Sequence, residues 1–244
     1  MFYEPARTQY DLDFQFLGIP IRVHPLFWIL TLFLGMNLSG PQMLILWILA
    51  VFISILVHEL GHALVMRTYG LQPRIVLYSF GGLTIFDRRY HLRWFENVLV
   101  SFAGPGAGFC FLAVLTGLFC LLGQTQILNI FPAAFGIEPA GSGFVLSESL
   151  TILLCFLIQV NVFWGILNLM PIFPLDGGQI VREFLMYRSP AIGLPLSLKI
   201  SIGTAGAWAF FFFTHGMFFN GLLFVWMLYS NYQILQQLTT RRSW

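Results

Sequence analysis

The chain has 244 residues, of which 58% are hydrophobic and only 9% are charged, and its mean hydropathy is +0.81. Globular proteins carry about 25% charged residues, so this composition leaves too little polar surface for a soluble fold. It excludes a disulfide-rich extracellular scaffold, a nucleic-acid-binding protein and a disordered chain. The net charge of +2 gives no information about partners. The composition predicts an all-α polytopic membrane protein embedded in the lipid bilayer.

Six apolar stretches are candidate membrane spans, because a helix that crosses a bilayer core of about 30 Å needs roughly 20 apolar residues. The first sixteen residues are polar and carry three acidic side chains, so they are not expected to form a cleavable signal peptide. Only a short turn around His215 separates the last two stretches. The predicted spans are 24–39, 42–66, 95–122, 149–171, 193–213 and 216–237.

The basic residues orient these spans, because Lys and Arg gather in the cytoplasmic loops of membrane proteins. Under the six-span model all twelve lie on one side of the membrane. We therefore expect both termini in the cytoplasm and the loop at about 123–148 on the opposite side. The basic residues are Arg7, Arg22, Arg67, Arg74, Arg88, Arg89, Arg93, Arg182, Arg188, Lys199, Arg241 and Arg242.

The segment 74–87 differs from the apolar stretches around it. Two short runs rich in β-forming residues flank Gly81 and Gly82. Paired glycines allow the positive φ angles that a tight hairpin turn requires. We expect a small membrane-associated β-hairpin here, at the cytoplasmic surface, whose edge can accept a further strand.

Ionisable side chains are rare in the apolar stretches, and they cluster. The second stretch contains His58-Glu59-Leu-Gly-His62. Ionisable groups inside a bilayer are costly and indicate function. Residues four apart share one helix face, so the two imidazoles can bind one Zn²⁺ while Glu59 acts as general base on a water molecule. A catalytic zinc site uses three protein ligands and keeps the fourth position open.

The candidate third ligand is Asp176, directly after the fourth apolar stretch. Pro171 and Pro174 cannot continue a regular helix, and irregular backbone at membrane depth must be buried in protein or line a wet cavity. We expect an irregular segment that presents Asp176 to the metal. Two alternatives stay open: Asp176 caps a turn beside Gly-Gly, and Asn168 either donates a hydrogen bond to an oxyanion or caps the interrupted helix.

The spacing between the histidine motif and the next basic residue predicts how deep the metal lies in the bilayer. His62 lies five residues before Arg67, which corresponds to roughly 7 to 8 Å of helix. We therefore expect the metal in the cytoplasmic half of the bilayer, with the site open to water from the cytoplasm.

Two motifs carry a family resemblance: His58-Glu-Leu-Gly-His62, and after it Asn168-x-x-Pro-x-x-Pro-Leu-Asp176-Gly-Gly. In this order the pair resembles the site-2 protease family of intramembrane zinc metalloproteases. Residues 18–25, 78–82 and 103–105 support the resemblance, which covers about residues 18 to 185.

The resemblance implies that His58, His62 and Asp176 hold one zinc ion per chain and that Glu59 is the general base. It also implies that Asn168 helps to stabilise the intermediate, and that the substrate is the transmembrane helix of a single-pass membrane protein. Residues 1–244 are then expected to form one membrane metalloprotease domain. Its core would cover about 42–185, with accessory spans at 24–39 and 193–237.

Other functions fit parts of this pattern. A divalent-metal transporter or channel could use the same residues as a transient ion site, although it would need no general base. A prenyl-protein protease also carries the first motif, but a Glu is expected as its third ligand, and Leu175-Asp176-Gly177 argues against it. A catalytically silent scaffold is disfavoured because every proposed catalytic residue is present. The natural substrate, the cut position, the oligomeric state and regulation without a PDZ or CBS domain stay open.

Overall fold

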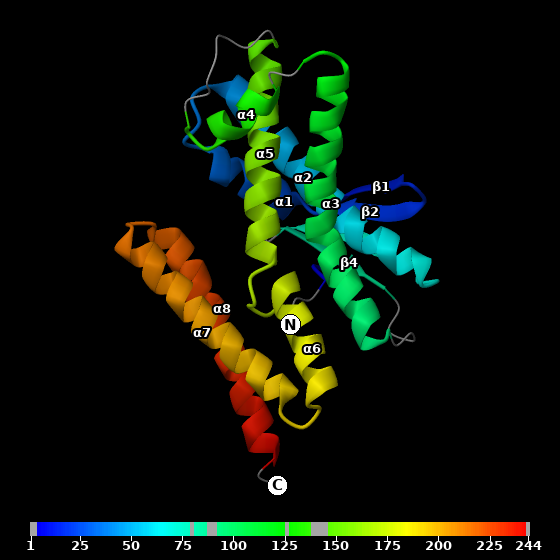
Figure 1. Cartoon of the computed structure of the whole chain (residues 1–244), viewed down its shortest axis with the longest axis vertical. Coiled ribbons are helices and arrows are strands. Elements are labelled where there is room, and N and C mark those ends of the chain that lie inside the picture. Colours follow the sequence, from blue (N-terminus) through cyan, green and yellow to red (C-terminus); the bar gives the residue numbers. More distant parts are fainter. Residues whose placement is uncertain (1–3, 79–80, 87–91, 125–126, 138–145, 243–244) are drawn as a thin grey trace. The chain divides into compact units, whose positions relative to one another are not determined.

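The computed structural model describes residues 4–78, 81–86, 92–124, 127–137 and 146–242 (Figure 1). The chain divides into two compact units, residues 1–90 with 103–165 and residues 91–102 with 166–244. Two long helices, α3 (Trp94–Leu121) and α5 (Glu148–Asn168), contribute residues to both units. The expected single metalloprotease domain stays a prediction.

The described chain is mostly helical, as predicted, but the first unit contains a four-stranded sheet where the sequence predicts only a β-hairpin at 74–87. Its strands are β1 (Leu12–Phe16), β2 (Ile19–Val23), β3 (Arg74–Tyr78) and β4 (Gly81–Ile85), and they lie side by side in this order. The outer pairs are antiparallel, and β2 runs parallel to β3. Leu17 and Gly18 connect β1 to β2 with φ angles of 53° and 73°, the conformation of a two-residue hairpin turn.

The predicted hairpin at 74–87 exists as β3 and β4, but its glycines do not form the turn. Gly81 and Gly82 lie inside β4, and residues 79–80 and 87 fall outside the described residues. Both glycines allow close approach. A Cβ at Gly81 would lie 2.6 Å from the Trp164 ring, and one at Gly82 would collide with the Glu59 carboxylate. The sequence interpretation therefore assigned these residues the wrong role.

The inner face of the sheet packs against helices and forms the first core. Ile19, Ile21, Val23, Ile75 and Leu77 are at most 1% exposed. They pack with buried residues of α1 (Pro25–Gly35) and α2 (Pro41–Thr68). This packing places β4 beside the part of α2 that carries the histidine motif.

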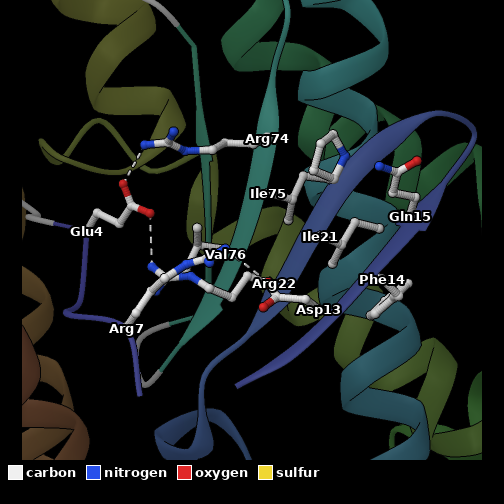
Figure 2. Close-up of a pocket in the computed structure, with 11 residues that line it drawn as sticks. Glu4, Arg7, Asp13, Phe14, Gln15, Ile21, Arg22, Arg74, Ile75 and Val76 are labelled. Atoms are coloured by element: carbon white, nitrogen blue, oxygen red, sulfur yellow. Dashed lines mark hydrogen bonds and ion pairs between the residues drawn. The ribbon is translucent and has the colours of Figure 1, made fainter. Parts of the chain in front are cut away.

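Ion pairs fasten the N-terminal segment to the outer face of the sheet. The Arg22 side chain, only 5% exposed, donates hydrogen bonds to Glu4 at 3.0 Å and to Asp11 at 3.1 Å. Figure 2 shows Glu4 reaching both Arg22 and Arg74, beside a cavity of about 520 Å³. Hydrogen bonds from Thr8 lower the pKa of Asp11, and the Arg22 charge acts in the same direction. The Asp11 carboxylate is thus favoured in its ionised form beside the Arg22 guanidinium.

A second core joins α2, α3 and α5 to α4 (Ile127–Ala134), a helix inside the stretch that the sequence predicts as a long loop. Ile127, Ile130 and Ala134 recur at helical spacing and are at most 4% exposed. This short amphipathic helix buries its apolar side against the membrane helices.

The second unit contains α6 (Asp176–Arg188), α7 (Gly193–Thr214) and α8 (Phe218–Arg242). The last two form a helical hairpin (Figure 1). Their core contains Ala205, Ala209, Phe212 and Phe224 together with Ile172, which belongs to the irregular segment before α6. Segment and hairpin therefore share one hydrophobic core.

Four of the described helices are long and apolar enough to cross a membrane, namely α2, α3, α5 and α7. They support an integral membrane protein, but the six-span count is not confirmed. α1 has 11 residues and reaches only roughly 16 Å at 1.5 Å per residue. The second half of α8 is rich in Gln and Thr.

Candidate metal centre

The two histidines of the motif lie one turn apart on α2 and direct the same ring nitrogen toward one point. The distance between His58 Nε2 and His62 Nε2 is 3.2 Å, and the rings are 4% and 7% exposed. Two nitrogens at about 2.0 to 2.1 Å from one tetrahedral zinc would be roughly 3.3 Å apart. Ligand atoms of His58, Glu59 and His62 all lie within 4.8 Å of one another. The three residues therefore fit a metal site.

Gly104 of α3 leaves space beside these nitrogens. A Cβ at this position would lie 2.7 Å from His58 Nε2 and would collide with His62 Nε2. Gly61, inside the motif, lies equally close to α3, since its Cβ would be 2.6 Å from that of Ala107. The two helices thus approach each other at glycines, and no α3 side chain at position 104 fills the space in front of the imidazoles.

Glu59 is held by the sheet. Its side chain is 5% exposed, and its Oε2 accepts a hydrogen bond from the Thr84 hydroxyl at 2.7 Å. Gly82 of the same strand lies against the carboxylate without a side chain between them. Strand β4 therefore fixes the orientation of the candidate general base.

An aromatic ring and a polar pair complete the surroundings of the motif. Trp164 of α5 lies with its ring centroid 6.5 Å from that of His58. One turn before His58 on α2, the Ser54 hydroxyl accepts a hydrogen bond from Asn161 of α5 at 2.8 Å, and both side chains are buried. This bond ties the face of α2 that carries the histidines to α5.

Sequence reasoning missed several of these neighbours. Thr84 is an ordinary strand residue, and nothing in its local sequence indicates that it bonds to Glu59. Gly104 belongs to the Ala103-Gly-Pro105 run, which supports the family resemblance without indicating contact with the histidines. Only the tertiary structure shows these contacts, because they join residues more than twenty positions apart.

Asp176 and Asn168 lie in the second unit, at the two ends of the irregular segment 169–175. The predicted interruption is confirmed, because α5 ends at Asn168 and α6 begins at Asp176. Both side chains are 7% exposed. Asp176 occupies the first turn of α6 rather than the N-cap position, which Leu175 holds. That Asp176 joins the histidine pair, and that Asn168 faces the substrate, stay predictions.

The glycines after Asp176 allow close backbone approach, as expected. A Cβ at Gly177 would collide with the Leu169 carbonyl, and one at Gly178 with the backbone of Ile172 and Phe173. The first turn of α6 therefore packs directly on the irregular segment, which bends back against it.

Comparisons with known proteins agree with this architecture. The family model described as peptidase family M50 matches residues 46–205, a range that includes both motifs. A zinc metalloprotease of Methanocaldococcus jannaschii is 29% identical over 216 residues, which cover 87% of this chain and 55% of that protein. The chain spans about half the length of the curated relatives it matches. A solved site-2 protease from Methanocaldococcus jannaschii has the same fold, with a TM-score of 0.56, 22% identity and coverage of 93% of this chain and 95% of that one.

Proposed function

Because the chain belongs to peptidase family M50, we propose that it is a zinc-dependent intramembrane endopeptidase of the site-2 protease type. Its substrate is a single-pass membrane protein, cut within or near the transmembrane segment. The observation that carries this proposal is the buried His58–Glu59–His62 cluster, with Glu59 held by the Thr84 hydroxyl. The curated relatives, all named as zinc metalloproteases, support the same chemistry.

The zinc ligands in this proposal are His58, His62 and Asp176. The converging histidine nitrogens and the absence of a side chain at Gly104 fit such an ion. A bound zinc ion lowers the pKa of a water molecule to about 7 and polarises the carbonyl group that the water attacks. Asp176 adds a negative charge that two neutral imidazoles do not supply.

Glu59 moves the proton. Its carboxylate removes a proton from the attacking water and later delivers it to the leaving amine. Since the Thr84 hydroxyl binds Oε2, the carboxylate keeps one orientation throughout both transfers. Asn168 donates a hydrogen bond to the oxyanion that develops on the substrate carbonyl.

The site opens to the cytoplasm, with both chain termini on that side. Support comes from the distribution of the twelve basic residues. Arg67, at the end of α2, donates a hydrogen bond to the Leu17 carbonyl in the β1–β2 turn, so the turn lies near the end of α2 that follows the motif. A fragment cut at this depth is released toward the cytoplasm.

A helical substrate must unwind before it is cut, because its carbonyls are engaged in the helix. Unwound backbone in lipid costs several kcal/mol per unsatisfied group. Strand β4 is one of the two edge strands of the sheet, and Thr84 connects it to Glu59. Strand addition at this edge supplies hydrogen bonds to the unwound segment and brings the scissile bond to the general base.

A proline at Leu83 or at Ile85 is therefore expected to reduce cleavage of a transmembrane substrate. Leu83 pairs with Val76 and Ile85 with Arg74 in the hydrogen-bonded positions of the antiparallel ladder, so their N–H groups face β3. Proline has no N–H and therefore distorts β4 and its free edge, and a displacement of about 1 Å at the reacting bond costs roughly 100-fold in rate. Cleavage rate and zinc content are measured on the same preparation. The control is Leu12→Pro, on the opposite edge strand β1, which should cleave normally. Unchanged cleavage by both β4 variants with zinc retained would contradict strand addition.

The function itself is tested with purified protein and a library of single-pass membrane segments. We expect mass spectrometry to find cleavage within or beside the apolar stretch of some segments. Removal of zinc by a chelator should abolish cleavage, and added zinc should restore it. Zinc-loaded protein that cleaves no segment, or cleavage that persists without metal, would overturn the proposal.

A further inference from the structure

In the irregular segment before α6, one residue forms hydrogen bonds with side chains of two helices, α7 and α8. The Phe173 backbone N–H donates a hydrogen bond to the Ser201 hydroxyl of α7 at 3.0 Å. The Phe173 carbonyl accepts one from the Asn231 side-chain amide of α8 at 2.6 Å. Both backbone polar groups of this residue are therefore bound, and neither partner is close in sequence.

The two partners are themselves fully buried and fixed. Ser201 is 1% exposed and donates to the Ser197 carbonyl at 2.9 Å, while Asn231 is 0% exposed and also donates to the Met227 carbonyl at 2.8 Å. Burying a polar group is costly unless it is hydrogen-bonded. Since Ile172 beside them is 0% exposed in the core of the hairpin, these bonds allow the Phe173 backbone to enter an apolar environment.

Phe173 is coupled to the first turns of α6. The Leu175 N–H donates to the Ile172 carbonyl at 2.8 Å. Gly178 packs on the Phe173 backbone so closely that a Cβ would collide with it. The Arg182 guanidinium carbon lies 5.4 Å from the centroid of the Phe173 ring, within cation–π range. A shift of Phe173 must therefore shift the start of α6, where Asp176 lies.

We propose that Ser201 and Asn231 are positioning residues for Asp176, and that the α7–α8 hairpin acts through the Phe173 backbone to set where this carboxylate lies. The inference rests on the proposed function, in which Asp176 is a zinc ligand. It gives α7 and α8 a role in the metal centre, because their side chains hold the backbone of the segment that precedes the ligand Asp176. Groups that orient a ligand in this way typically change metal affinity by about 10 to 100-fold.

The test measures zinc affinity, by competition with a chelator, for full-length Ser201→Ala and Asn231→Leu. Each is expected to bind zinc about 10 to 100-fold more weakly than wild type and to lose kcat more than KM. Ser201→Thr keeps the hydroxyl and should restore the affinity. The matched control is Ser197→Ala, because Ser197 is 3% exposed on the same helix and, among the residues that the structure describes, its hydroxyl donates to the Leu194 carbonyl of α7 and not to the irregular segment. The control should bind zinc like wild type.

An Asp176→Ala variant, measured alongside, tests the zinc-ligand assignment of Asp176 separately from the positioning role of Ser201 and Asn231. If Asp176→Ala weakens zinc binding but Ser201→Ala and Asn231→Leu do not, the positioning role is overturned and the zinc site stands. If Asp176→Ala leaves zinc affinity unchanged, the ligand assignment fails and the positioning role fails with it. An equal loss of zinc in Ser197→Ala would also overturn the inference, because the effect would then belong to α7 in general.

Discussion

Glu59→Gln is expected to keep zinc and to lose proteolysis. The amide has the shape of the carboxylate, so the Thr84 hydroxyl can still donate to its oxygen and the histidine nitrogens are unaffected. The amide cannot accept a proton from water, and general acid–base catalysis contributes about 100 to 10,000-fold in rate. We expect a loss of that size in the cleavage rate of a transmembrane substrate, with one zinc per chain in both proteins.

The control for this substitution is Glu148→Gln, which removes a carboxylate at the exposed start of α5. It should cleave at the wild-type rate. If Glu59→Gln still cleaves normally, the mechanism is wrong. Metal transport by both wild type and Glu59→Gln would instead favour a transporter, since a transient ion site needs no general base.

The grouping of His58, Glu59 and His62 was predictable because the chain contains so few charges. In a sequence with 9% charged residues, buried ionisable groups stand out against apolar surroundings, and the spacing of His58 and His62 determines their shared helix face. The two prolines likewise predict the break between Asn168 and Asp176. The family resemblance drawn from these two motifs is confirmed by the match over residues 46–205.

The sheet was only half predictable. The pattern of β3 and β4 is visible in the sequence, but β2 pairs with β3 across about 50 residues (Val23 opposite Leu77), and local patterns do not reveal such long-range pairing. Leu12, Phe14 and Phe16 alternate with polar residues, which is the signature of a strand. The N-terminal segment as a whole is polar, however, and this composition obscures the alternation.

Glycine shows why some contacts cannot be read from sequence. A Gly-Gly pair between two β-rich runs favours a turn, but here Gly81 and Gly82 make room for Trp164 and Glu59. Both uses depend on the missing Cβ. Only the tertiary neighbours decide between them, and for Gly82 and Gly104 these neighbours are the motif residues themselves.

Gly104→Ala is expected to impair zinc binding while leaving the fold intact. The added methyl group would collide with His62 Nε2 and would lie 2.7 Å from His58 Nε2, so the ligands must move apart or rotate. Overpacking of this kind costs about 1 to 3 kcal/mol, which corresponds to roughly a 5 to 150-fold loss of zinc affinity. The measurement is chelator competition, with cleavage falling in parallel.

The same substitution at Gly117 separates this effect from helix stability. Alanine favours a helix over glycine by about 1 kcal/mol, and a Cβ at Gly117, also in α3, meets nothing within 4 Å. Gly117→Ala should therefore bind zinc like wild type and unfold at an equal or higher temperature. Gly104→Ala gains the same helix preference in its metal-free form, so a loss of zinc without a loss of metal-free thermal stability would locate the strain at the histidine nitrogens. Wild-type zinc affinity in Gly104→Ala would show that the space beside His58 and His62 is not required for the metal.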